Sequence, residues 1–158
     1  MIGEYMKNKI LNIIKIAVII ELLVALLNFN LTTIFLSLFT LFLLFLADYI
    51  KKKLEIPYKL QLLIYIFIIG TEVLGEIHNL YNKVWYYDDI MHTLSSFIVA
   101  SLSIYILNKI TKDNNKKLVV VFSFILPMAV AAIWEITEFT IDNVFNKDMQ
   151  KDTIVTSI

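Results

Sequence analysis

Apolar residues run through most of the chain in five long stretches that are separated by short polar segments. The stretches cover about residues 10–29, 32–49, 60–81, 89–107 and 118–143. A helix needs about 20 consecutive apolar residues to cross the hydrocarbon core of a bilayer. The pattern therefore predicts an all-α fold, a polytopic transmembrane helix bundle of about five spans. A chain of 158 residues also favours one domain, 1–158.

The composition supports a membrane environment. Apolar residues make up 59% of the chain and charged residues 18%, against about 45–50% and about 25% in a typical soluble domain. A soluble enzyme and a disordered chain are both poor matches to these values. The net charge is zero, so no basic excess points to a nucleic acid partner. The chain has no cysteine, which excludes disulfides and thiolate metal ligands.

The distribution of lysines predicts the orientation. Lysines are concentrated in cytoplasmic loops of membrane proteins. The side that holds most of them carries Lys7, Lys9, Lys15, Lys51, Lys52, Lys53, Lys59, Lys109, Lys112, Lys116 and Lys117, while Lys83, Lys147 and Lys151 lie on the other side. We therefore expect a multi-pass protein of the cell membrane with its N-terminus in the cytoplasm and its C-terminus outside. The first span has no small-residue cleavage site after it, so we interpret it as a retained helix and not a signal peptide.

Ionisable residues inside the predicted spans are the main sign of chemistry. An acid at the centre of a membrane helix costs about 2.5–3.5 kcal/mol on insertion scales. The third span nevertheless holds Glu72, Glu76 and His78, the fourth opens with Asp88, Asp89 and His92, and the fifth holds Glu135, Glu138 and Asp142. With the predicted orientation, all three groups reach the same depth near the outer leaflet. The site is thus expected to be built by residues 72–92 and 135–152.

The spacing of these residues predicts a metal site. Residues three or four apart share a helix face, as Glu72 and Glu76 do, and Asp89 and His92 resemble the Glu-x-x-His device of metal centres in helix bundles. Carboxylate and imidazole ligands suit a divalent ion such as Mn, Fe, Zn, Mg or Ca. The expected ligands are Glu76, Asp88, Asp89, His92, Glu135, Glu138 and Asp142, with Glu72, Gln150 and Asp152 as additional ones. We expect Glu135 and Glu138 to be catalytic as well.

Several of these residues also have a simpler interpretation. Glu21, near the middle of the first span, is interpreted as a helix-pairing or snorkelling residue. His78 lies off the Glu72 face and is interpreted as a headgroup-level histidine. One of Asp88 and Asp89 can cap a helix, and Asp142 can be a solvated helix end. Pro127 in the fifth span is expected to kink that helix.

Two segments resemble the YjdF-type family of small, uncharacterised prokaryotic membrane proteins. The first, residues 75–92, contains Gly75-Glu76, Tyr81, Tyr86-Tyr87-Asp88 and His92, and the second contains Trp134-Glu135 and Glu138. The resemblance covers the second half of the chain and picks out Glu76, Asp88, His92, Glu135, Glu138, Asp142, Gln150 and Asp152. The layout is distantly similar to that of VanZ-like proteins. The relatives continue into a further helix, whereas this sequence stops at Ile158. Whether a final helix is missing is therefore left open.

Three functions compete on this evidence. The first is a metal-dependent membrane enzyme acting on a lipid-like or phosphate-bearing substrate near the outer leaflet. The second is a proton or divalent-cation transporter or channel, against which the inner halves of the third to fifth spans look apolar. The third is a non-catalytic membrane subunit in which the polar cluster holds helices together. The lipid bilayer is the expected partner in each case, and homo-oligomers are left open.

Overall fold

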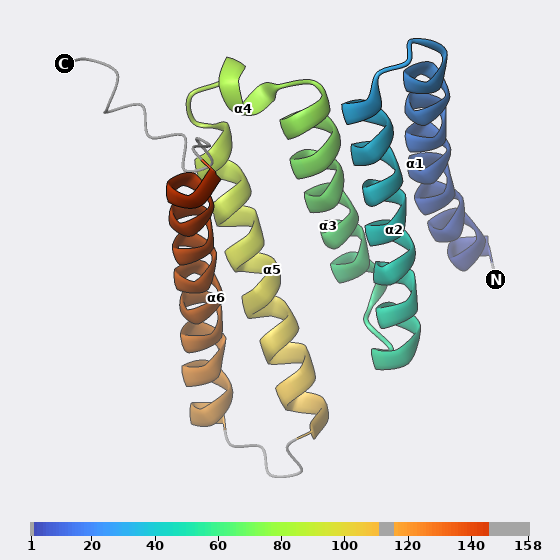
Figure 1. Cartoon of the computed structure of the whole chain (residues 1–158). Helices are drawn as coiled ribbons and strands as arrows, with labels where there is room; N and C mark the ends of the chain where they lie inside the picture. Colours follow the sequence, from blue (N-terminus) through green and yellow to red (C-terminus); the bar gives the residue numbers. More distant parts are fainter. Residues whose placement is uncertain (1, 111–115, 146–158) are drawn as a thin grey trace. The chain divides into compact units, whose positions relative to one another are not determined.

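In the computed structural model of the chain, the residues described are 2–110 and 116–145 (Figure 1). They form helices joined by short turns. Five helices are long and apolar enough to cross a membrane, namely Asn8–Leu27, Leu31–Leu54, Tyr58–Ile77, Tyr87–Ile110 and Lys116–Val144. The predicted all-α, five-span polytopic fold is therefore confirmed.

The elements fall into two compact units, Met1–Ile98 and Val99–Ile158, and each is described by itself. The helices are α1 (Ile2–Leu27), α2 (Leu31–Leu54), α3 (Tyr58–Ile68), the π-helix η1 (Ile69–Ile77), α4 (Leu80–Lys83), α5 (Tyr87–Ile110) and α6 (Lys116–Phe145). The first unit holds α1 to α4 and the first half of α5. The second unit holds the rest of α5 and α6.

Two tight turns make the first three helices of the first unit antiparallel. Between α1 and α2, Asn30 caps α2 by accepting a hydrogen bond from the backbone N of Thr33 at 3.1 Å, which satisfies one of the free N–H groups of the first turn. At the other end of α2, Glu55 adopts the left-handed conformation with φ 57°. Below we call the end of the first unit formed by residues 28–30 and 78–86 the aromatic end, and the end formed by residues 51–57 the lysine end.

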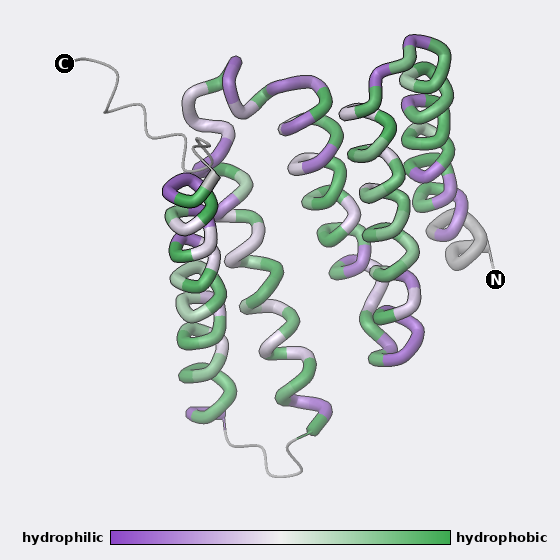
Figure 2. The backbone as a smooth tube through the Cα atoms, viewed as in Figure 1, coloured by the Kyte–Doolittle hydropathy of each residue, from purple (hydrophilic) through white to green (hydrophobic). Residues whose placement is uncertain are grey.

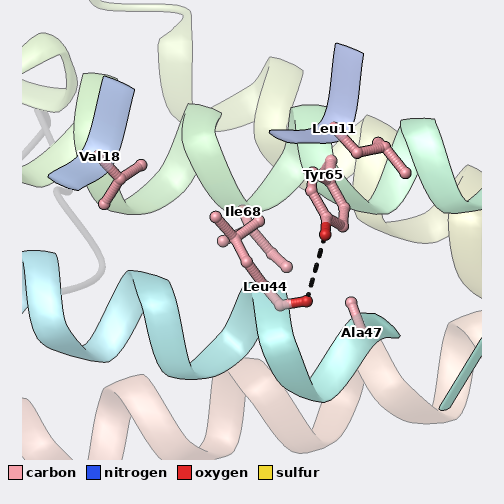
Figure 3. Packing of buried hydrophobic residues seen from close by; sticks show 6 residues of the cluster. All are labelled: Leu11, Val18, Leu44, Ala47, Tyr65 and Ile68. Carbon is pink, nitrogen blue, oxygen red and sulfur yellow. Dashed lines mark hydrogen bonds between the residues drawn. The ribbon is translucent and has the colours of Figure 1, made fainter. Parts of the chain in front are cut away.

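The core of the first unit lies between α1, α2 and α3. It contains Leu11 and Val18 from α1, Leu44 and Ala47 from α2, and Tyr65 and Ile68 from α3 (Figure 3). Most other apolar side chains on these helices are exposed, and Figure 2 shows hydrophobic positions along nearly their whole length. Such a surface suits lipid, since lipid tails are as apolar as leucine.

The third span differs from its sequence-based prediction at its end. The prediction extended one helix to Tyr81, but the span ends at Ile77 and a separate four-residue helix, α4, follows it. Asn79 between them has φ 60°, a left-handed conformation that Asn tolerates better than most residues and that breaks the helix. The fourth span begins at Tyr87, two residues before the predicted start.

Candidate functional site

The π-helix η1 positions two of the predicted site residues, Glu72 and Glu76. In a π-helix each N–H bonds to the carbonyl five residues earlier, as the N–H of His78 does to Val73 at 2.9 Å. The hydroxyl of Thr71 bonds the carbonyls of Phe67 at 3.1 Å and Ile68 at 3.2 Å, where the α-helical ladder changes to the wider one. Wide helical turns of this kind are frequent at functional sites. The sequence predicted an ordinary α-helix here.

Two contacts hold η1 against the beginning of α5. The buried hydroxyl of Tyr87 donates a hydrogen bond to the carbonyl of Gly70 at 2.8 Å. A Cβ on Gly70 would lie 2.8 Å from Sδ of Met91, so the glycine allows the two helices to approach closely. These contacts bring Glu72 and Glu76 into the same region as the first turns of α5.

Gly75 makes room for the ring of Tyr81, which lies among the carboxylates. A Cβ on Gly75 would be 2.3 Å from Cε2 of that ring. Burial, followed by the negative charges of Asp88 and Glu76, raises the pKa of Tyr81 well above its usual value. The ring also packs edge to face against Tyr87 at 5.3 Å between centroids. Tyr81 is therefore a protonated hydroxyl surrounded by acids.

The start of α5 contributes a carboxylate–imidazole pair. Nε2 of His92 lies 3.4 Å from Oδ2 of Asp88, and each side chain is 31% exposed. A carboxylate next to a ring nitrogen orients the imidazole, as it does for metal-binding histidines. Asp89 is exposed, and its carbonyl accepts a hydrogen bond from the hydroxyl of Thr93 at 2.8 Å.

Glu21 and His78 lie together at the aromatic end. Nε2 of His78 is 3.9 Å from Oε2 of Glu21, which joins α1 to the end of η1. The distance is too long for a hydrogen bond, so the pair is electrostatic and forms when the imidazole is protonated. The structure thus gives Glu21 a helix-pairing contact, the interpretation favoured from the sequence.

In the second unit, three predicted site residues follow one another along α6. Glu138 is buried at 5% exposure, whereas Glu135 is exposed and Asp142 is intermediate. Nearby hydroxyls bond their own helix, as that of Thr137 does to the carbonyl of Ile133 at 2.7 Å. Burial of a carboxylate is costly unless it is compensated, which makes Glu138 the most unusual acid of α6.

The structure thus brings three predicted residues of the first unit, Glu72, Glu76 and Asp88, near Tyr81. His92 joins them through its pairing with Asp88, whereas Asp89 is exposed. Their donor atoms are carboxylate oxygens and imidazole nitrogens, which fit a divalent ion of the Mn, Fe, Zn, Mg or Ca kind. Within the part of the chain that the structure describes, Glu72 and Glu76 form no ion pair with a lysine. Gln150 and Asp152 lie outside the described residues.

A second polar group in the first unit was not predicted as a site. Asp48 on α2 accepts hydrogen bonds from Lys15 on α1 and from Gln61 and Tyr65 on α3. The prediction assigned Lys15 to a cytoplasmic segment and treated the inner half of the third span as apolar, which is wrong for Gln61 and Tyr65. Gln61 and Tyr65 are four residues apart, so they share one helix face, which also carries Ile68. This spacing was the signal in the sequence that could have predicted a polar group here.

The chain is similar to one protein from a thermophilic bacterium. An uncharacterised protein of Thermotoga maritima is 28% identical over 102 residues, which are 62% of this chain and 53% of that protein. The chain therefore spans about half the length of this relative. No solved structure matches the chain.

A family model matches nearly the whole chain. The model, described as "Predicted membrane protein (DUF2238)", covers residues 10–157. The match extends over all five apolar helices and over every predicted site residue of both units. Together with the five spans, it establishes a multi-pass protein of the lipid bilayer. The chain belongs to the DUF2238 family of membrane proteins.

Proposed function

We propose that the protein binds a divalent metal ion through carboxylates and imidazole at its aromatic end, and acts as a metal-dependent enzyme on a lipid-like or phosphate-bearing substrate. The observation that carries the proposal is the grouping of Glu72, Glu76 and Asp88 near the half-buried Tyr81, with His92 paired to Asp88. The nearest lysine in sequence, Lys83, donates a hydrogen bond to the carbonyl of His78 at 2.8 Å and not to a carboxylate of this group. A cation is the simplest compensation for such a group.

The proposed ligands are the set expected from the sequence. The first unit would supply Glu76, Asp88, Asp89 and His92, with Glu72 beside them. From α6, Glu135, Glu138 and Asp142 would complete the set, and Gln150 and Asp152 are further candidates. Their common depth in the topology predicted from the sequence supports this set. The likeness of their motifs to the YjdF-type family supports the same set.

The residues have distinct roles in this proposal. A bound divalent ion would supply water activation or polarisation of a phosphoryl or carbonyl oxygen. Glu135 is exposed, so it can accept a proton from water, whereas the buried Glu138 is suited to binding. Asp88 orients His92. Tyr81, held protonated, can donate a hydrogen bond to an anionic substrate oxygen.

The orientation is part of the proposal. The distribution of lysines favours a cytoplasmic N-terminus and an external C-terminus in the cell membrane, which places the aromatic end at the outer leaflet. Trp85 is 82% exposed there and stacks edge to face on Tyr86. Aromatic side chains of this kind prefer the headgroup level, where a lipid headgroup could reach the carboxylates.

A second candidate function is transport of protons or divalent cations. The polar contacts of Asp48 with Lys15, Gln61 and Tyr65 favour it, because they place polar groups at the lysine end as well as the aromatic end. A non-catalytic subunit, in which the polar groups only join helices, is the third candidate. It predicts that amide replacements of the carboxylates are tolerated.

Metal analysis tests the proposal. The detergent-purified protein, prepared without chelators and resupplied with divalent ions, would be compared by elemental mass spectrometry with Glu135→Gln/Glu138→Gln and His92→Ala. We expect near-stoichiometric metal in the wild type and its loss in both variants. Glu55→Gln, the same chemical change in the exposed turn of the lysine end, is the matched control and should retain the metal.

One result of the metal analysis would overturn the proposal. Wild-type protein that holds no more metal than the variants, while all of them stay monodisperse, has no metal site at these residues. If metal is present, hydrolytic assays on lipid phosphates then separate an enzyme from a metal-binding subunit.

A further inference from the structure

Asp48 is the centre of a polar group that connects three helices inside the membrane-spanning region of the first unit. Its Oδ1 accepts a hydrogen bond from Nε2 of Gln61 at 2.8 Å and from the hydroxyl of Tyr65 at 2.7 Å. Its Oδ2 pairs with Nζ of Lys15. The ammonium also lies over the rings of Phe45, 5.0 Å from its centroid, and Tyr65, at 5.9 Å. We call these four residues, Lys15, Asp48, Gln61 and Tyr65, the lysine-end centre.

The lysine-end centre lies within the spans and not in the loops. Lys15 is in the span Asn8–Leu27, Asp48 in Leu31–Leu54, and the other two in Tyr58–Ile77. Gln61 is 3% exposed and Tyr65 is fully buried. Charged residues at such positions are rare and commonly mark ion pathways or proton relays. None of these four residues belongs to the ligand set proposed for the metal site.

Buried polar side chains continue from this centre along α2 toward the aromatic end. Ser37, Thr40, Leu44 and Asp48 share one face, because residues three, four and seven apart lie above one another on a helix. Ser37, Thr40 and Leu44 are each fully buried. Only Leu44 separates the hydroxyls from Asp48 along this face.

The facing helix, α3, supplies the matching positions. The Tyr65 hydroxyl also lies 3.4 Å from the carbonyl oxygen of Leu44 (Figure 3). A helix carbonyl points toward the residue four positions later, so this hydroxyl lies on the Asp48 side of Leu44, and water has to bridge the step from Thr40. Thr40 lies one helical turn beyond Leu44, about 6 Å along the axis. The hydroxyl of Thr40 bonds the carbonyl of Leu36 at 2.7 Å and keeps its lone pairs for a further donor.

Ser37 gives independent support for a further hydrogen-bonding group in this interface. Its Oγ is buried and has no hydrogen-bond partner among the residues that the structure describes. A buried polar atom without a partner costs about 1–3 kcal/mol, and a water molecule is the usual way to satisfy it. Ser37 lies on the same face as Thr40 and Asp48, closer to the aromatic end. A hydrated file of hydroxyls is consistent with all three positions.

We propose that the interface of α2 with α3 and η1 conducts protons between the aromatic end and the lysine-end centre. A proton that arrives by way of water at Ser37 and Thr40 is accepted by the hydroxyl oxygen of Tyr65, which passes its own proton to Oδ1 of Asp48. The neutral carboxyl loosens its pairing with the Lys15 ammonium. Release of the proton at the lysine end restores the carboxylate and the ion pair, so one proton enters and one leaves.

The charged groups that face Asp48 are identified on each neighbouring helix. From α1 it is Lys15, and from α3 the contacts are the neutral Gln61 and Tyr65. The ammonium compensates the carboxylate between proton transfers. The proposal depends on none of the proposed metal ligands, so it can hold or fail independently of the metal site.

Proton flux into liposomes tests the pathway. The full chain would be reconstituted into vesicles that enclose a pH-sensitive dye, and the internal pH followed after an acid pulse with valinomycin and K⁺ clamping the potential. We expect wild-type flux clearly above that of protein-free vesicles. Tyr65→Phe keeps the ring but removes the proton carrier, and should lower the protein-dependent flux by about 100-fold, the lower range for loss of a positioned proton-transfer group.

The chain offers a matched control for this change. Tyr49→Phe is the same substitution one residue from Asp48, on an exposed position of α2, and should leave the flux unchanged. A neutral pair, Lys15→Met/Asp48→Asn, removes the acceptor without leaving a lone buried charge and should also abolish the flux. Each variant is first shown to be monodisperse and helical.

Two results would overturn the proposal. Wild-type vesicles that are no more permeable to protons than protein-free ones contain no pathway, and the lysine-end centre then only joins helices. Wild-type flux that persists in Tyr65→Phe or in the neutral pair takes another route.

Discussion

The two polar groups of the first unit differ in how their charges are compensated. At the lysine end, Asp48 faces the ammonium of Lys15 and two neutral donors, Gln61 and Tyr65. At the aromatic end, Glu72 and Glu76 repel one another, and both lie with Asp88 near Tyr81. The lysine-end centre is complete in the protein alone, whereas the aromatic end is an arrangement that a cation would stabilise.

This difference separates what holds the bundle together from what is available for chemistry. A compensated ion pair with satisfied hydrogen bonds contributes to the pairing of α1, α2 and α3. A group of like charges costs stability unless it binds something or shares protons. Removal of a carboxylate should therefore lower the stability at the lysine end and leave it unchanged or higher at the aromatic end.

The largest expected effect is from Asp48→Asn. It leaves the Lys15 ammonium without its counter-charge inside the span. Loss of one partner of a buried pair costs about 3–5 kcal/mol, and because the Asp48 side chain is 34% exposed, we expect a cost at or below the lower end of that range. Thermal unfolding in detergent, followed by circular dichroism, would show a large fall in midpoint. Lys15→Met/Asp48→Asn should recover much of it.

The opposite end supplies the control for this comparison. Glu76→Gln removes one like charge from the aromatic end and should leave the metal-free unfolding midpoint unchanged or higher. An equal fall in midpoint for Asp48→Asn and Glu76→Gln would contradict the distinction between the two ends.

The next effect concerns the two glycines of η1. Gly75→Ala would push a methyl group into the ring of Tyr81, at 2.3 Å, whereas Gly70→Ala meets the flexible end of Met91, at 2.8 Å from its sulfur. Overpacking typically costs about 1–3 kcal/mol, so we expect Gly75→Ala to reach that range and Gly70→Ala to cost less. Chemical denaturation of both variants side by side measures the difference. The reverse order would show that the Tyr81 ring yields more easily than the methionine.

The smallest effect is the ionisation of Tyr81. Burial and the charges of Asp88 and Glu76 raise its pKa in the folded protein, above the value of about 10 for an unfolded chain. The stability that this shift contributes is fully present below the unfolded pKa and is lost as the pH rises toward the folded pKa. Tyr81→Phe should therefore lower the late part of the alkaline absorbance change at 295 nm by the amplitude of one tyrosine. A titration unchanged by the substitution would place the late tyrosine elsewhere.

The sequence predicted some features well because they depend on composition along a single helix. The five spans follow from runs of apolar residues, and the polar positions at Glu72, Glu76, Asp88 and His92 follow from their contrast with those runs. The π-helix was not predictable in this way. It is accompanied by two bonds from the Thr71 hydroxyl to backbone carbonyls and by the bond from Tyr87 to the carbonyl of Gly70, 17 residues before it.

The lysine-end centre shows the same limit more strongly. Lys15 and Asp48 are 33 residues apart, and each alone looks like a residue near the end of a span. Only the antiparallel packing of α1, α2 and α3 brings their charges together.

The sequence by itself determined the membrane environment, the number of spans and the residue types available for chemistry, because hydrophobic burial in lipid depends on local composition. The tertiary structure decided which of those residues meet. A charge is stabilised by whatever lies within a few ångströms of it, and in this chain those neighbours come from other helices.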